Sequence, residues 1–256
     1  MISAKRIVVA VFLLASLARA GALITAQVVR DAVADAVGSA VSGWVVDANS
    51  WLGQGVRGPQ YERRSVASAE AGTPLVLLTD DGTIVFPIQL RPPAITREIN
   101  LKLKSYAQQR VRIGGRLIRR GPEKAIVIQY VTSEHDPAVD APIPAEEPSR
   151  VEVVARVVGL NSWMGQDGSG PGDSAVKLAR FGEPLVLVDD SGYVLYPVTK
   201  STPSGPASHY LLADYAEHKV RVKGTLIERG KARAILVDNV SAYEPNLAQG
   251  NPGPGE

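Results

Sequence analysis

The chain has 256 residues, enough for one large domain or two small ones. Its 28 Lys and Arg against 26 Asp and Glu give a formal net charge of +2, too small to indicate a polyanionic partner. It contains no cysteine, which excludes disulfides, thiolate metal sites and cysteine nucleophiles.

The chain opens with the plan of a secretory signal peptide. Two basic residues precede an apolar run over 7–17, and Ala18-Arg19-Ala20 has the A-x-A form of a cleavage site. We therefore predict a cleaved signal over residues 1–20. The alternative is an uncleaved membrane anchor, which would have to hold Arg19 within its apolar span. In both cases the basic start predicts that the rest of the chain lies outside the cytoplasmic membrane, free in the periplasm or anchored.

Residues 21–41 are predicted to form an amphipathic helical segment. Apolar side chains recur there every four or five positions, close to a helical stripe, with polar residues between them. The stripe consists of Ile24, Val28, Val33, Val37 and Val41. Such a helix would pack on the first domain or continue an uncleaved anchor.

An internal repeat determines the expected architecture. Residues 45–54 match 157–166, residues 72–77 match 182–187, and residues 111–118 match 220–227, in the same order. The copies are assigned to residues 42–134 and 151–243. A Pro-rich linker over 135–150 joins them, and a tail over 244–256, rich in Gly and Pro, is predicted to be disordered.

Each copy is predicted to contain five strands and one helix. The first strand is expected to end at Trp51 or Trp163 and to be followed by a Gly-rich loop. Residues 74–78 and 83–88 form a predicted hairpin, a helix follows near 99–106 and 210–215, and a second hairpin ends the copy. A helix between the third and fourth of five strands is the order of an OB fold. We therefore predict an all-β chain with two tandem OB-fold-like five-stranded barrels. The rival is one larger sandwich made from both copies.

The pattern V-V-D-x-x-S-W-L-G-Q-G, then A-G-T-P-L-V-L-L-T-D-D-G, then Y-A-x-x-R-V-R-I-G-G-R-L-I-R-R-G, resembles small exported bacterial OB-like domains of poorly known function. The resemblance covers both copies and implies the barrel fold. Many of those domains carry cysteines and a histidine in the loop after the first strand. The matching positions here are Ser50, Gln54, Arg64 and Ser68, so no metal or redox chemistry is carried over.

No residue pattern indicates a catalytic or metal centre, and we expect a protein that is not an enzyme and has no cofactor. The three histidines, His135, His209 and His218, lack the spacing of metal ligands. Residues 165–173 are rich in Gly but have neither the lysine of a phosphate-binding loop nor the closing Glu of a calcium loop. A flexible connection is the expected role.

Trp51 and Trp163 occupy the same place in the two copies. This favours a role in the common fold, such as closing one end of the barrel. The alternative is ligand stacking, because the first loop of an OB fold often borders its binding face.

Charge distinguishes the copies. Residues 42–134 hold 13 Lys and Arg against 8 Asp and Glu, an excess of five, whereas residues 151–243 hold 10 of each. The excess is concentrated in the last hairpin of the first copy, at Arg110, Arg112, Arg116, Arg119, Arg120 and Lys124. This hairpin is the predicted partner-binding site, with an acidic protein surface or anionic lipid as the partner and no nucleic acid. The alternative is a solvated strand face.

Together these features predict a binding or scaffolding protein, an accessory subunit of a cell-envelope or membrane complex. The alternative is a periplasmic small-ligand-binding protein whose pocket lies between a barrel and its first loop, near Trp163.

Overall fold

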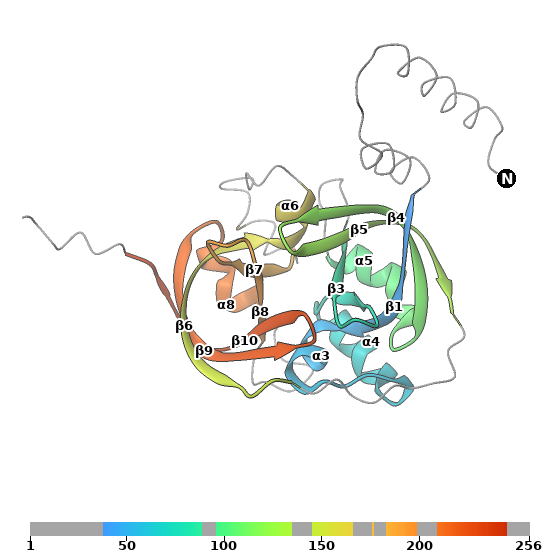
Figure 1. The fold of residues 1–256 in the computed structure, drawn as a ribbon, viewed down its shortest axis with the longest axis horizontal. Helices are drawn as coiled ribbons and strands as arrows, with labels where there is room; N and C mark the ends of the chain where they lie inside the picture. The colour runs from blue at the N-terminus through green and yellow to red at the C-terminus, as the bar shows by residue number, and fades with distance from the viewer. Residues whose placement is uncertain are drawn as a thin grey trace, which may run out of the picture. The chain divides into compact units, whose positions relative to one another are not determined.

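The computed structural model describes residues 38–88, 96–134, 145–165, 176, 183–198 and 209–244, and its strands form two five-stranded sheets (Figure 1). The first sheet contains β1 (Ser39–Asp47), β2 (Leu75–Leu78), β3 (Ile84–Ile88), β4 (Arg110–Arg120) and β5 (Glu123–Ser133). The second contains β6 (Ser149–Gly159), β7 (Leu185–Val188), β8 (Val194–Val198), β9 (Lys219–Arg229) and β10 (Ala232–Ala242). The described residues from Ala40 onward belong to one compact unit.

Short helices connect these strands. The first copy contains α3 (Ala48–Gln54), η1 (Pro59–Tyr61), α4 (Glu62–Glu70), α5 (Thr96–Leu103) and η2 (Lys104–Tyr106). The second contains α6 (Leu160–Gly165), α8 (His209–Leu212) and η3 (Ala213–Tyr215). Within the described ranges, no helix combines the length and the apolar character needed to cross a membrane.

The two sheets have the same topology, which confirms the prediction of a mostly β chain built on a repeat. The strand order is β1-β2-β3-β5-β4 in the first sheet and β10-β8-β7-β6-β9 in the second, and each sheet closes into a barrel. In both, the third and fifth strands pair in parallel, whereas the first and second, the second and third, and the fourth and fifth strands pair antiparallel. A β-bulge interrupts the last hairpin at the same place in both copies.

The first strand of each copy ends earlier than predicted. β1 ends at Asp47 and the helix α3, which contains Trp51, follows directly. The Asp47 carboxylate accepts a hydrogen bond from the Ser50 backbone N–H (2.9 Å), an N-cap that starts the helix at this point. The prediction of a Gly-rich loop was also wrong in the first copy, because η1 and α4 occupy most of it.

Several predicted segments lie partly or wholly outside the described residues. These include residues 1–37, with the predicted signal peptide and most of the amphipathic segment, and residues 135–144 and 245–256. Residues 39–41, predicted to end the amphipathic helix, instead begin β1. The last residues of the predicted linker run beside the second sheet, since Ala145 forms a β-bridge with Arg229 and β6 begins at Ser149.

The buried apolar residues form three clusters, one inside each barrel and one between them. The inner face of the first barrel contributes Val45, Leu77 and Val85, and that of the second contributes Val157, Leu187 and Leu195. The third cluster takes the alternate residues of the same strands from both copies. It includes Val46, Val76, Leu78 and Phe86 from the first and Val158, Val186, Val194 and Tyr196 from the second. The strands β2, β3, β7 and β8 and the last residues of β1 and β6 are therefore buried on both faces.

Equivalent residues of the two copies meet in this shared cluster. Phe86 and Tyr196 occupy the same position in the repeat, and their rings stack with centroids 6.2 Å apart and planes 7° apart. Gly82, in the hairpin turn of the first copy, meets Gly230 of the second so closely that a Cβ on Gly82 would lie 2.8 Å from the Gly230 Cα. The barrels thus pack through like faces, the geometry of an isologous dimer contained in one chain.

Both copies keep a buried carboxylate at the start of the first helix, but the first takes it from the end of β1 and the second from the segment just before β7. Asp47 in the first copy aligns with Gly159 in the second, where the Glu183 carboxylate fills the space and accepts the Ser162 N–H (2.8 Å). A Cβ on Gly159 would lie 2.4 Å from the Glu183 Cδ. Burial raises the pKa of Glu183. The capping interaction is thus conserved between the copies although its residue is not.

This exchange predicts a strong coupling between two substitutions in the second copy. Glu183→Thr should remove the acceptor of the Ser162 N–H and destabilise the protein by about 1–3 kcal/mol. Gly159→Asp should also destabilise it, because the new side chain collides with Glu183. The double variant recreates the arrangement of the first copy and should recover most of the loss in a urea-unfolding cycle. A double variant as unstable as the sum of the single variants would contradict this account.

Candidate functional site

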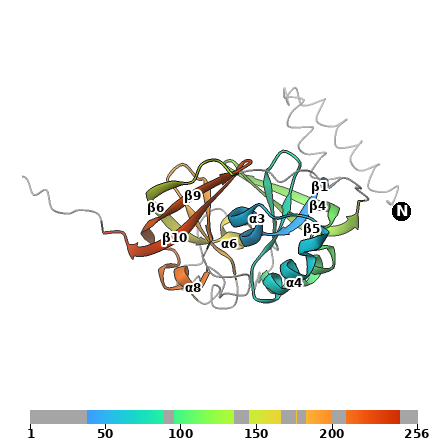
Figure 2. The same cartoon turned by 90° about the horizontal axis from the view of Figure 1, so that it is seen from below.

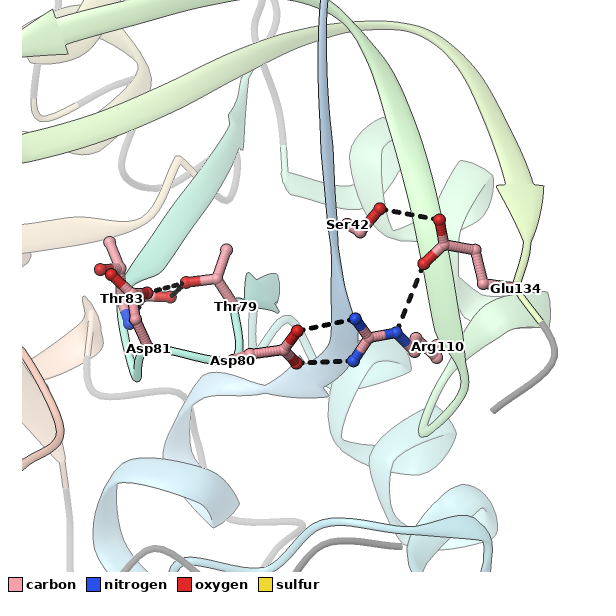
Figure 3. A network of polar contacts seen from close by, with 7 residues as sticks. All are labelled: Ser42, Thr79, Asp80, Asp81, Thr83, Arg110 and Glu134. Carbon is pink, nitrogen blue, oxygen red and sulfur yellow. Dashed lines mark hydrogen bonds and ion pairs between the residues drawn. The ribbon is translucent and has the colours of Figure 1, made fainter. Parts of the chain in front are cut away.

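The six basic residues of the predicted partner-binding hairpin fall into four groups in the structure. Arg110 belongs to the framework, because its guanidinium binds both oxygens of Asp80 (2.6 and 2.7 Å) and also lies 3.4 Å from Glu134 (Figure 3). The Arg110 hydrogen bond holds the pKa of Asp80 below its usual value. The second copy keeps the same pair as Lys219 and Asp190 (2.9 Å). The conserved pair ties the start of the last hairpin to the first one.

Arg120 reaches the other barrel instead of solvent. It lies over the Trp163 ring, 5.2 Å from the centroid, and donates a hydrogen bond to the Trp163 carbonyl in α6. Its equivalent Arg229, 7% exposed, reaches the opposite way and donates to the Leu52 carbonyl in α3 (3.4 Å). Figures 1 and 2 accordingly show α6 beside β4 and α3 beside β10. These two arginines connect the barrels.

Trp51 and Trp163 take part in the same packing. Trp51 is 1% exposed within the shared cluster, and Trp163 is partly buried against it. Both rings therefore pack between the barrels, and Arg120 lies over the Trp163 ring.

Arg112, Arg116 and Tyr130 define an exposed surface on the last hairpin of the first barrel, here called the basic face. Both arginines are exposed, and neither has an acidic partner within the described part of the chain. Tyr130 pairs across the strands with Gly114 and is 51% exposed. A Cβ on Gly114 would lie 2.0 Å from the Tyr130 ring, so the ring can lie against the strand only because residue 114 is Gly. The result is an exposed aromatic ring with unpaired arginines on the same hairpin.

The equivalent surface of the second barrel is neutralised. Glu152 binds Arg221 (2.6 Å) and Lys223 (3.2 Å), the residues that align with Arg112 and Gly114. The position of Glu152 is occupied by Ala40 in the first copy. Compared with its counterpart, the basic face therefore lacks an acid equivalent to Glu152 and has a tyrosine, since Tyr130 aligns with Asn239.

The two remaining predicted residues, Arg119 and Lys124, face each other across the ladder at the tip of the hairpin. Like charges in directly opposed positions destabilise a sheet. The second copy has Glu228 opposite Arg233 at this position, a salt bridge of 2.9 Å. Neither Arg119 nor Lys124 has an ion pair with any residue that the structure describes.

A cavity of about 350 Å³ lies between the barrels, next to this cation pair. Its twelve lining residues are six pairs of equivalent positions, so the cavity lies where the two copies are related to each other. The pairs are Thr83 and Tyr193, Ile84 and Val194, Phe86 and Tyr196, Pro122 and Lys231, Glu123 and Ala232, and Lys124 and Arg233. In two of these pairs, Pro122 with Lys231 and Glu123 with Ala232, only one copy contributes a charged side chain; together with Lys124 and Arg233 they give the lining charges of both signs.

Sequence reasoning found Lys124 but missed the rest of the cavity and Tyr130. The continuous apolar runs 75–78 and 185–188 indicate that both faces of these strands are buried. A strand with one solvated face would have apolar and polar residues in alternation. The exchange of Lys223 for Gly114 and of Asn239 for Tyr130 is visible in the repeat alignment.

The positions that correspond to cysteines and histidine in the resembling domains are only partly assembled. Ser50 and Ser68 both contact Asp47, the Ser68 Oγ at 3.4 Å, whereas Gln54 is exposed. In the described ranges no three His, Asp or Glu side chains are placed to hold a metal ion. His218 is exposed, and His135 lies outside these ranges.

Comparisons with known proteins give no relative for this chain. No family model matches the sequence, no curated protein matches it, and no solved structure matches the fold.

The division of the arginines into connecting and exposed groups predicts different effects on stability. Arg229→Ala should lower the free energy of unfolding by about 1–3 kcal/mol, because it removes a buried donor from the contact between the barrels. Arg116→Ala should change it by less than about 0.5 kcal/mol, since that side chain is exposed. Chemical denaturation measures both. Equal effects of the two substitutions would show that Arg229 does not connect the barrels.

Proposed function

We propose that this chain is a non-catalytic binding protein that acts outside the cytoplasmic membrane, as an accessory subunit of a cell-envelope or membrane complex. Each copy is, in this proposal, an OB-like barrel, supported by five strands with a helix between the third and fourth. The basic start and apolar run of residues 1–20 support export or anchoring.

The observation that carries the proposal is the unneutralised basic face of the first barrel. The framework of the copies is the same, and the second copy pairs its basic residues with Glu152. Fold stability therefore does not explain why Arg112 lacks an acid and why Tyr130 is exposed beside it. An acidic protein surface supplies the missing partner charge, and an exposed tyrosine is a frequent anchor in protein interfaces.

An anionic lipid surface is the second source of negative charge. An anionic lipid surface would neutralise the arginines, but it does not explain why the Tyr130 ring is held against the strand at Gly114. We favour the protein partner and treat vesicle binding as the discriminating measurement.

The basic face is tested by removing its charges and comparing equivalent losses in the second copy. Arg112→Gln with Arg116→Gln should reduce the amount of the partner that co-purifies with the full chain from native envelopes, most strongly at low salt, because exposed charges act chiefly on association. Arg221→Gln with Lys223→Gln removes the same charge from ion-paired positions and should leave co-purification nearly unchanged.

A partner retained by the Arg112 and Arg116 double variant at every salt concentration would show that the basic face is only a solvated surface. Binding of the purified chain to anionic vesicles, lost in the same double variant and absent with zwitterionic vesicles, would replace the protein partner by a lipid one. Tyr130→Ala should weaken a protein contact about tenfold, within the range of interface anchors, and should leave the vesicle contact nearly unaffected.

The alternative function, a small-ligand receptor, is favoured by a different feature. The pocket of such a receptor was expected beside Trp163, but Arg120 packs on that ring. The cavity lies instead between the barrels. Ligand sites often occur at interfaces between domains.

A further inference from the structure

The cavity between the barrels has the size and lining of a small-molecule site. Its volume of about 350 Å³ falls at the lower end of the range for such sites, about 300–1,000 Å³. Ile84, Phe86, Val194 and Tyr196 give it an apolar wall that belongs to the shared cluster. A planar or compact apolar group therefore finds a preformed surface there.

The charged groups of the lining are not equally available to a ligand. Lys231 binds Asp81 (2.6 Å), and Arg233 binds Glu228 (2.9 Å), so both cations already have acids. Lys124 has no acid among the described residues, and Arg119 faces it across the strands. Lys124 is therefore the lining cation that has no ion pair within the described part of the chain, and Arg119, which lies outside the lining, is its neighbour on the opposite strand.

Glu123 is the acid of the lining, and it is engaged. One of its oxygens accepts a hydrogen bond from the Val194 N–H (3.2 Å) of the other barrel. Burial raises the pKa of Glu123. The hydrogen bond from the Val194 N–H also connects the two barrels.

The second copy has an ion pair at the positions equivalent to Arg119 and Lys124. There Glu228 and Arg233 form an ion pair across the ladder, at no cost in repulsion. In the first copy the same two positions hold Arg119 and Lys124, and the repulsion is not relieved by any described residue. A bound anion would relieve it, in the place where Glu228 does so in the other copy.

We propose that the inter-barrel cavity binds a small organic carboxylate, with the carboxylate between Lys124 and Arg119 and an aromatic or compact apolar body against Phe86 and Tyr196. This inference deepens the second candidate function and does not depend on the basic face. A ligand held there contacts both copies, so it stabilises the packing of one barrel on the other.

Phenylacetate is a suitable probe, with 2-phenylethanol as its uncharged analogue and acetate as the anion without a ring. Isothermal titration of the full chain should show saturable binding of one phenylacetate per chain, at least tenfold tighter than that of 2-phenylethanol or of acetate. Binding should also raise the melting temperature, because the ligand binds only the folded chain.

Three variants locate the site. Lys124→Gln and Arg119→Glu should each weaken phenylacetate binding at least tenfold, the second because it recreates the ion pair of the other copy. The control, Lys102→Glu, changes the charge by as much as Arg119→Glu at an exposed helical position and should not weaken binding. Circular dichroism checks that each variant is folded, and Arg119→Glu should be no less stable than the parent because it removes a repulsion.

Absence of saturable binding, equal affinity for 2-phenylethanol, or binding unaffected by Arg119→Glu would each overturn the proposal. These outcomes leave the basic face untouched, because Arg112, Arg116 and Tyr130 are unchanged in all three variants. Conversely, loss of partner binding by the Arg112 and Arg116 double variant, with phenylacetate binding intact, separates the two sites.

Discussion

The strands β2, β3, β7 and β8 and the last residues of β1 and β6 bury both of their faces, one inside their own barrel and one against the other copy. Fully burying a side chain such as Val, Leu or Phe stabilises a fold by about 1.5–3 kcal/mol, so the shared cluster contributes on the scale of a domain core. The Phe86–Tyr196 stack, the Gly82–Gly230 contact and the reach of Arg120 and Arg229 into the opposite barrel all follow from this packing. The cavity lies where the packing of equivalent faces leaves space.

The two copies form the same fold, so residues that differ between them are not required by that fold. These differences therefore distinguish functional residues from structural ones. The pair Arg110–Asp80 is kept as Lys219–Asp190, and the carboxylate of Asp47 is kept by moving it to Glu183. Where an interaction is needed for the barrel, the second copy therefore preserves it even by another route. The first copy has no acid at the positions equivalent to Glu152 and Glu228, and no other described residue there compensates for it. Binding of an external anion would explain this difference.

The repeat made much of the fold predictable. Periodicity placed the hairpin of β2 and β3, the helix before β4 and the alternating strand β4 within a few residues. The end of β1 was misplaced because the apolar run continues through Ala48, Trp51 and Leu52, and only the Asp47 cap shows that the backbone has changed from strand to helix. For the candidate site, the alignment supplied the basic residues but not their grouping, which depends on the second barrel. Arg120 and Lys124 look alike in sequence, yet one packs on Trp163 and the other lines the cavity.

Calorimetry of the full chain with and without Phe86→Ala measures most directly whether the two barrels form one cooperative unit. Removing the Phe86 ring from the shared cluster should cost about 3–5 kcal/mol. The account predicts a single transition in both proteins, with equal calorimetric and van't Hoff enthalpies, that moves as a whole to lower temperature. Two transitions, of which Phe86→Ala shifts only one, would contradict it, because the second barrel would then be stable without the face that the first one covers.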